Sequence, residues 1–246
     1  MTTHLADAVP SAVLWDMDGT VIDSEPLWLA AELTMLSRYG IELTDDTRDR
    51  IVGSGLRAAA ALFQELGVPM SSDDIIAEWT AAVIAGLHAG EPAWRPGALE
   101  LLASLRAAGI PSALVTMAFR EIADAVVELL PPGTFVTIVA GDEVAHEKPH
   151  PDPYLRGAAA VGVPVERCVA IEDSPTGLRS AHAAGAVAIG VPNLVDLTTA
   201  PSHELWPTLA GVDATRLAER FRSLRELSPT APDSERDTAD ATGDPQ

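Results

Sequence analysis

Two aspartates, Asp16 and Asp18, follow directly on a short apolar run and are the first residues of the chain that suggest chemistry. The run, residues 12–15, lies between Pro10 and Gly19, which is typical of a buried strand. Because Gly19 permits a sharp turn at the strand end, the two carboxylates are expected to lie close together. Like charges at that separation require a cation, a raised pKa on one partner, or exposure to water. Taken alone, the pair also fits a solvated acidic turn, so the ends of the other strands must decide.

The elements that would position these aspartates follow an alternating pattern. Apolar runs of strand length and helical patterns take turns along the chain, with strands expected at 112–115, 135–140, 168–171 and 187–191 and helices at 98–108, 120–130, 152–161, 176–184 and 214–227. This alternation is the signature of βαβ units. Together with the opening strand, it predicts an α/β fold with a Rossmann-like, doubly wound parallel sheet covered by helices on both faces.

A block of helical patterns interrupts this alternation after the first strand. Helices are expected at 25–39, 56–66 and 72–87, with Leu29, Leu33 and Leu36 as apolar positions of the first, and nothing in the block is typical of a strand. We therefore predict an α/β core domain from residues 1–23 and 95–227 and an inserted α-helical cap domain from residues 24–94. Residues 228–246 contain almost no apolar side chains, which predicts a disordered acidic tail.

Polar residues stand where the predicted strands end. Thr116 follows the strand at 112–115, Lys148 lies in the loop after 135–140, and Glu172 and Asp173 follow the strand at 168–171. Thr116 and Asp173 could each simply cap a helix if considered alone. Ligands in open α/β sheets bind outside the carboxyl ends of the strands, however, so we expect these residues to converge with Asp16 and Asp18. Lys148 is the single lysine among sixteen lysines and arginines.

One hydroxyl, one lysine and four carboxylates suit phosphoryl chemistry. Mg²⁺ takes carboxylate and carbonyl oxygens and commonly holds a substrate phosphate as a further ligand. A phosphoryl group at the metal also requires a fixed cation and hydroxyl or backbone N–H donors, which Lys148 and Thr116 can supply. An aspartate can then attack phosphorus to form an aspartyl phosphate. Asp18 remains to protonate the departing alkoxide and later to accept a proton from water.

These motifs resemble those of the haloacid dehalogenase-like superfamily. The residues are Asp16 to Thr20 (DMDGT), Thr116, Lys148 with Pro149, and Ile171 to Ser174 (IEDS), and the helical insertion resembles the subgroup that includes sugar phosphatases and β-phosphoglucomutase. The resemblance implies Asp16 as nucleophile and metal ligand, and Asp18 as acid and base with its backbone carbonyl on Mg²⁺. It further implies that Glu172 and Asp173 complete the metal site, while Thr116 and Lys148 hold the phosphoryl group.

Three further residues are candidate substrate contacts. Relatives often carry Asn after the Ser or Thr of the second motif, whereas this chain has Met117 and Ala118, so only backbone N–H donors remain there. Arg120, at a predicted helix start, and Arg57, in a Gly-rich turn of the predicted cap, could each bring a cation to the substrate.

Hydrolysis of a small phosphorylated metabolite, most simply a sugar phosphate, is the leading functional hypothesis. A sugar-phosphate mutase of the β-phosphoglucomutase type is the alternative, but such mutases add a cap lysine and a histidine soon after the first motif. Residues 24–94 contain no lysine, and His88 is their one histidine. A non-enzymatic phospho-accepting signalling module is a weaker alternative, because it needs neither a helical insertion nor a second acid.

Composition limits the partners. A formal net charge of −20 argues against nucleic-acid or anionic-membrane surfaces, which require clustered cations. Cys168 is the single cysteine, which excludes an intramolecular disulfide or a cysteine-based zinc site. No apolar run approaches the roughly 20 residues of a membrane span. We therefore expect a cytoplasmic protein that acts on a small phosphate ester as a monomer or weak homodimer.

Overall fold

The structure, a computed structural model, describes residues 9–51 and 55–227, so the predicted acidic tail lies outside the described residues. Its centre is a parallel sheet in the order β3-β2-β1-β4-β5-β6. The strands are β1 (Ala12–Trp15), β2 (Ser112–Val115), β3 (Thr137–Val139), β4 (Cys168–Glu172), β5 (Val187–Gly190) and β6 (Glu204–Leu205). The predicted α/β fold with a parallel sheet is confirmed, and β1 lies between β2 and β4.

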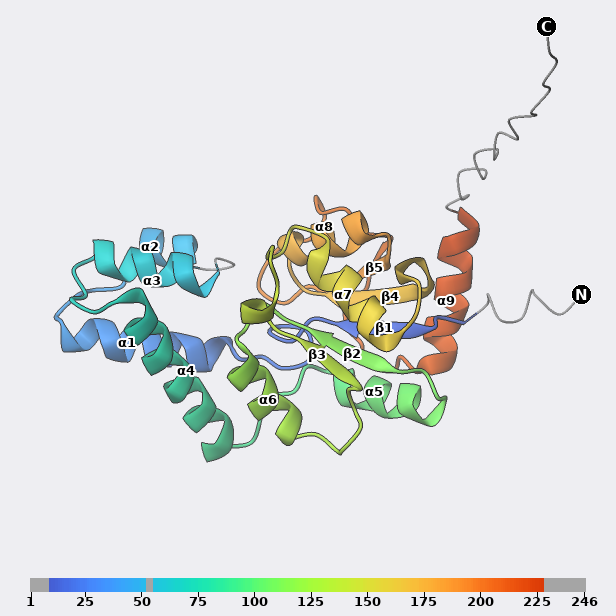
Figure 1. Cartoon of the computed structure of the whole chain (residues 1–246), viewed down its shortest axis with the longest axis horizontal. Helices are drawn as coiled ribbons and strands as arrows, with labels where there is room; N and C mark the ends of the chain where they lie inside the picture. The colour runs from blue at the N-terminus through green and yellow to red at the C-terminus, as the bar shows by residue number, and fades with distance from the viewer. Residues whose placement is uncertain (1–8, 52–54, 228–246) are drawn as a thin grey trace, which may run out of the picture.

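Helices cover both faces of the sheet, because alternate residues of each strand point to opposite sides. Val13 and Trp15 face a core that includes α5 (Ala98–Ala107), α6 (Arg120–Glu128) and α9 (Ala214–Leu227). Ala12 and Leu14 face the opposite core, under α7 (Asp152–Val161) and α8 (Pro175–Ala184). Figure 1 shows the sheet between these two layers, with the carboxyl end of β1 directed toward the remaining helices.

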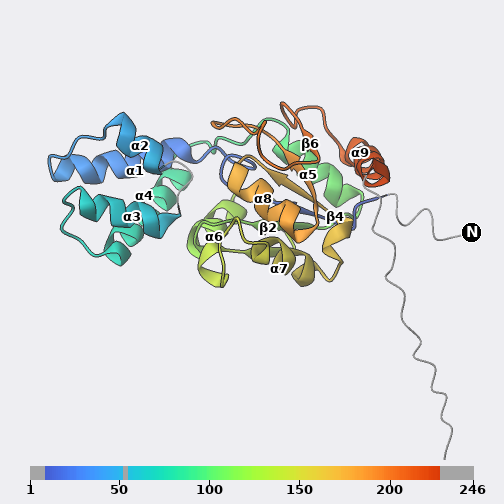
Figure 2. The ribbon, with the colours of Figure 1, turned by 90° about the horizontal axis from the view of Figure 1, so that it is seen from above.

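Those remaining helices form a block at one end of the molecule (Figures 1 and 2). They are α1 (Glu25–Arg38), α2 (Asp45–Ile51), α3 (Leu56–Glu65) and α4 (Ser72–Ala89). A separate apolar core holds these helices together. In it, the rings of Phe63 and Trp79 pack edge to face with their centroids 4.6 Å apart. Val83 and Leu87 of α4 also pack into the core beside α6, which links the block to the sheet.

The chain enters and leaves the helical block through two adjacent segments. Ile22 and Trp94 form an antiparallel bridge, Asp23 N–H donates to Ala93 O at 2.8 Å, and Arg95 N–H donates to Val21 O at 2.9 Å. The insertion therefore begins and ends at one place, directly after the turn that carries the two aspartates. None of the helices in the described part of the chain has the length and apolar content that spanning a bilayer requires.

The structure differs from the sequence prediction in several elements. Helix α2 and the two-residue strand β6 were not predicted, and β3 is shorter than the expected 135–140. In α1, Leu33 is 45% exposed although the apolar spacing predicts it to be buried, and Glu32 lies on the buried side instead, at 8%. The helix turns this face toward a cavity rather than toward a purely apolar core.

Candidate active site

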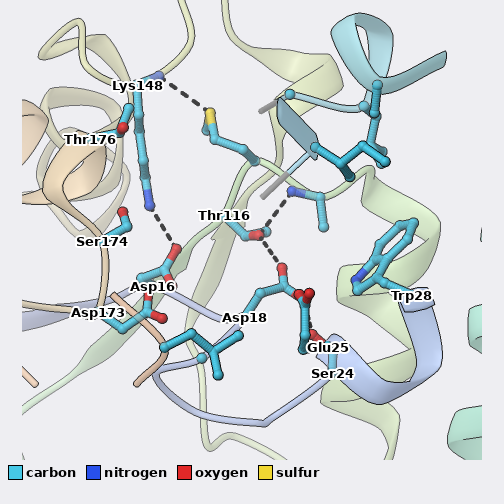
Figure 3. Close-up of a pocket in the computed structure, with 18 of the residues that line it drawn as sticks. Asp16, Asp18, Ser24, Glu25, Trp28, Thr116, Lys148, Asp173, Ser174 and Thr176 are labelled. Carbon is cyan, nitrogen blue, oxygen red and sulfur yellow. Dashed lines mark hydrogen bonds and ion pairs between the residues drawn. The ribbon is translucent and has the colours of Figure 1, made fainter. Parts of the chain in front are cut away.

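The loops at the carboxyl ends of β1, β2 and β4 form the floor of a cavity of about 270 Å³ between the sheet and the helical block. Asp16, Asp18, Thr116, Lys148 and Asp173 all line it, so the structure brings together the main residues predicted from the strand ends. Figure 3 shows that Lys148 extends toward Asp16 and that Asp173 lies beside Asp16. Asp18 points the other way, toward Thr116.

Lys148 is the electrostatic centre of this floor. Its Nζ donates to Asp16 Oδ1 at 2.7 Å, to Glu172 Oε1 at 2.7 Å and to Val115 O at 3.0 Å. Its side chain is only 4% exposed, and attraction to Asp16 and Glu172 together outweighs the effect of burial and raises the pKa of Lys148. Because all three N–H donors are occupied, a contact with a phosphoryl oxygen requires Lys148 to give up one of these bonds.

Glu172 holds Lys148 from behind rather than facing the cavity. It is fully buried at the end of β4, and Oε1 accepts a hydrogen bond from the Tyr154 hydroxyl at 2.9 Å in addition to the bond from Lys148. Oε2 accepts bonds from Ser174 N at 3.0 Å and Ser174 Oγ at 2.9 Å. Tyr154 also places its ring 5.0 Å from Lys148 Nζ. These contacts fix the lysine in the position where it meets Asp16.

Three carboxylates are close enough to share a cation. Asp16, Glu172 and Asp173 each offer an oxygen within 4.8 Å of the others. Burial raises the pKa of Asp16 to about 7, with Glu172 adding to the effect and Lys148 opposing it. Burial, followed by Asp16 and Glu172, also raises the pKa of Asp173 well above its ordinary value. Ionising these neighbouring carboxylates together is costly unless a positive charge lies between them. A divalent cation that prefers oxygen ligands can supply that charge.

Gly19 allows Asp173 to come so near. Its φ of +79° is in the left-handed region, and a Cβ at this position would lie 1.9 Å from Asp173 Oδ2. Any other residue would therefore displace the carboxylate from the loop that carries Asp16. The glycine of the first motif therefore leaves room for the Asp173 carboxylate against the loop that carries Asp16.

Asp18 has a different environment. The hydroxyl of Ser24 donates to Asp18 Oδ1, and Thr116 Oγ1 lies 3.4 Å from Asp18 Oδ2. Burial raises the pKa of Asp18, and hydrogen bonds from Ser24 and Trp28 act against that increase. No ion pair to Asp18 is present within the described residues. An acid with a raised pKa and no fixed cation partner is suited to carry a proton.

The second motif lines the cavity beside Asp18 with Thr116, Met117 and Ala118. Thr116 Oγ1 accepts a bond from Ala118 N–H at 3.0 Å. Met117 lines the cavity, and its sulfur accepts the Lys148 backbone N–H at 3.4 Å. The thioether thus supports the loop that carries the lysine.

The two arginines proposed from the sequence are not among the residues that line the cavity. Arg57 is 67% exposed and pairs with Asp73 at 3.2 Å. Arg120 is 45% exposed and pairs with Asp124 at 2.9 Å and Glu143 at 3.1 Å. Part of the Gly-rich turn before Arg57, residues 52–54, lies outside the described residues.

Sequence reasoning missed the supporting residues. The sequence does not predict that Ser24 donates to Asp18 or that Tyr154 donates to Glu172. Glu25, Trp28 and Glu32 were missed at the other end of the cavity, although their spacing of three and seven residues places them on one helical face. Their spacing could have indicated a shared helical face from the sequence. The sequence did not show, however, that this acidic face lines a cavity.

The fold and the site define an α/β protein with an acidic centre, anchored by a lysine, at the carboxyl ends of its strands. The family model described as haloacid dehalogenase-like hydrolase matches residues 13–191. The chain therefore belongs to the haloacid dehalogenase-like hydrolases, as the four motifs predicted.

Relatives within this family include named phosphatases. The chain is 35% identical to hexitol phosphatase A of Escherichia coli over 187 residues, covering 72% of this chain and 81% of the relative. It is 32% identical to phosphoglycolate phosphatase of Escherichia coli over 203 residues, covering 73% and 80%. Both names denote phosphoric monoester hydrolases.

A solved structure extends the likeness to most of the fold. A variant of CbbY from Rhodobacter sphaeroides, in complex with xylulose-1,5-bisphosphate, superimposes with a TM-score of 0.76 at 29% identity. The match covers 85% of this chain and 99% of that protein.

Proposed function

We propose that this protein is a Mg²⁺-dependent phosphatase that hydrolyses a small phosphorylated metabolite, a sugar phosphate, through an aspartyl phosphate on Asp16. The proposal is supported chiefly by the opposite environments of Asp16 and Asp18. One carboxylate lies with Lys148 and Asp173, and the other faces Thr116 and Ser24 without a cation. Such a pair can divide nucleophilic attack from proton transfer.

Asp16, Asp173 and the backbone carbonyl of Asp18 would hold the cation, with Glu172 completing the acidic cluster. When bound, Mg²⁺ supplies positive charge that offsets the carboxylates and the phosphoryl oxygens. Lys148 and Thr116 contact the phosphoryl oxygens in this proposal, and the backbone N–H groups at Met117 and Ala118 are further donors. These groups hold the phosphorus in line with Asp16.

The reaction then proceeds in two displacements. An oxygen of Asp16 attacks phosphorus, the bond to the sugar oxygen breaks, and the Asp18 carboxyl gives its proton to that oxygen. In the second displacement the Asp18 carboxylate takes a proton from water, whose oxygen attacks phosphorus. The bond to Asp16 breaks, inorganic phosphate leaves, and both aspartates return to their starting states.

The test is release of inorganic phosphate from a panel of sugar phosphates by the purified full chain with Mg²⁺. Asp16→Asn is expected to lower kcat by at least ~10⁴-fold, because no other group forms the covalent intermediate. Asp73→Asn, which alters an exposed aspartate outside the cavity, is the matched control. Full activity in Asp16→Asn would contradict the proposal. A requirement for a bisphosphate primer, with an isomer as product and no free phosphate, would show a mutase instead. Cytoplasmic location and a monomer or weak homodimer stay predictions.

A further inference from the structure

The end of the cavity under the helical block carries polar groups that the proposed reaction does not use. Glu25, Trp28 and Glu32 share one face of α1, and Trp79 belongs to α4, which packs against α1. All four residues line the cavity. Figure 3 shows Glu25 and Trp28 on the far side of Asp18 from Lys148, at the start of this region. We refer to these four residues as the cap end of the cavity.

Two groups at the cap end are buried without a partner. Glu32 is 8% exposed, and it makes no hydrogen bond or ion pair with any other residue that the structure describes. Trp79 is 1% exposed, and its indole N–H finds no acceptor within the same residues. Buried polar groups in proteins are nearly always hydrogen-bonded, so an acceptor and a donor left over beside a cavity point to a ligand.

The charge of the cavity restricts that ligand. The described lining residues include six carboxylates, on Asp16, Asp18, Glu25, Glu32, Glu147 and Asp173, and one cation, Lys148. Lys148 is already engaged by Asp16 and Glu172. Burial raises the pKa of both Glu25 and Glu32, and Arg48 opposes that increase, but Arg48 is not among the lining residues. A second anionic group on the substrate would therefore meet glutamates and no available cation.

We propose that Glu32 and Trp79 bind hydroxyl groups at the end of the substrate remote from phosphorus, and that the enzyme selects uncharged, hydroxyl-bearing monophosphates over substrates with a second anion. This inference rests on the proposed phosphatase function. A hydroxyl donates to the Glu32 carboxylate and also accepts from the Trp79 N–H. An ammonium group can only donate, and a carboxylate can only accept. The indole rings of Trp28 and Trp79 offer apolar surface to the C–H groups between the hydroxyls.

The proposal separates this chain from the CbbY structure, which holds a bisphosphate. A second phosphate carries up to two negative charges, and the described lining of this cavity gives it no arginine. The cap end is thus suited to bind neutral hydroxyl groups of a substrate rather than a second anionic group.

The experiment compares two substrates of equal length that differ at one carbon. Glucitol 6-phosphate ends in a hydroxymethyl group, and 6-phosphogluconate ends in a carboxylate. We expect kcat/KM with Mg²⁺ at about pH 8 to favour glucitol 6-phosphate by at least ~10-fold, because a like charge meets Glu32 in the other case. Glu32→Gln, which keeps the shape and removes the charge, should reduce that ratio by at least ~5-fold, mainly through KM. Glu42→Gln changes an exposed glutamate of the same helical block and should leave the ratio unchanged.

Trp79→Phe provides a second variant, because it removes the N–H and keeps an aromatic ring. It should raise KM for glucitol 6-phosphate by a larger factor than it raises KM for p-nitrophenyl phosphate, which has no remote hydroxyl. An equal kcat/KM of the wild type for glucitol 6-phosphate and 6-phosphogluconate would overturn the proposal. So would a ratio of these two values that is unchanged in Glu32→Gln. Preference for the matching glucamine 6-phosphate would overturn it in favour of an ammonium substrate.

The proposed function is judged separately with p-nitrophenyl phosphate. If the wild type hydrolyses this ester with Mg²⁺ and Asp16→Asn does not, the phosphatase function stands whatever the ratio between the sugar substrates. If the wild type releases phosphate from no ester, the phosphatase function and the inference both fail.

Discussion

The two ends of the cavity both carry buried carboxylates, but only one end balances them. At the sheet, Asp16 and Glu172 share Lys148, and Glu172 has further donors from Tyr154 and Ser174. At the cap end, Glu32 makes no hydrogen bond or ion pair within the described residues, and Arg48 offsets the burial of its charge only in part. In the proposed function, the compensated charges at the sheet take part in phosphoryl transfer, which is common to all substrates. The incompletely compensated glutamate would contact the part of the substrate that varies.

Lys148→Met tests the balanced end and should have the largest effect. The variant leaves Asp16 and Glu172 buried without their cation, so we expect a loss of about 3–5 kcal/mol in the free energy of unfolding. Phosphate release should fall by at least ~10³-fold on every substrate, because Asp16 and the phosphoryl group lose a fixed charge. Urea unfolding and phosphate assays measure the two effects. Arg156→Met removes an exposed cation and should cost no more than ~0.5 kcal/mol. If Lys148→Met were as stable as the wild type, Lys148 would not be the residue that compensates the buried charges of Asp16 and Glu172.

Asp18→Asn separates the proton step from the other functions of the same end. We expect the single-turnover rate of sugar release from a sugar phosphate to fall by roughly 10³-fold, because an alkoxide needs a proton as it leaves. On p-nitrophenyl phosphate the first displacement needs no such proton, so the single-turnover rate of nitrophenol release should fall by only about 10-fold. The second displacement uses Asp18 as the base on either ester, so these single-turnover rates give the comparison. Equal losses in the two rates would contradict the assignment of Asp18 as the acid.

Glu32→Gln tests the unbalanced end through stability. Burial, with a contribution from Glu25, raises the pKa of Glu32 from 4.5 to about 7, so the folded protein binds this proton more tightly than the unfolded chain. The resulting stability is present below the unfolded pKa and is lost as the pH rises through about 7. The glutamine cannot ionise, so at about pH 8 the variant should be more stable than the wild type by about 1–3 kcal/mol.

The same comparison near pH 4 provides the internal control. Both proteins then carry an uncharged group at position 32, and their unfolding free energies in urea should agree within about 0.5 kcal/mol. Glu42→Gln should show no such pH dependence. A pH-independent difference between Glu32→Gln and wild type would mean that the glutamate is not desolvated in the folded protein.

Arg57→Ala and Arg120→Ala should have the smallest effects. Both arginines are exposed and paired with neighbouring acids outside the cavity. We expect KM on a sugar phosphate to change by less than about twofold and stability by less than ~1 kcal/mol, as for most surface ion pairs. An increase in KM of ten times or more in either variant would place that arginine at the substrate and weaken the contrast between the two ends.

The sequence predicted the sheet end of the site well and the cap end poorly, for a physical reason. The carboxyl ends of parallel strands meet at one edge, so Asp16, Thr116 and Asp173 could be brought together from strand assignment alone. The buried face of a helix depends on what packs against it. In α1 the apolar spacing favoured Leu33, whereas the structure buries Glu32 beside the cavity. Lys148 and Tyr154 both donate to Glu172, and Lys148 also donates to Asp16. These contacts depend on packing between segments that are far apart in the sequence.

The bridge between Ile22 and Trp94 has a consequence for how such an enzyme can change over time. The chain leaves and rejoins the sheet at neighbouring points, so the helical block is an insertion whose two ends lie close together. Insertions of this geometry can be exchanged while the host fold stays intact. Substituting a different helical block at these two points would replace Glu32 and Trp79 while Asp16 and Lys148 keep their places. Selection can therefore act on substrate preference and on bond cleavage as two nearly independent traits.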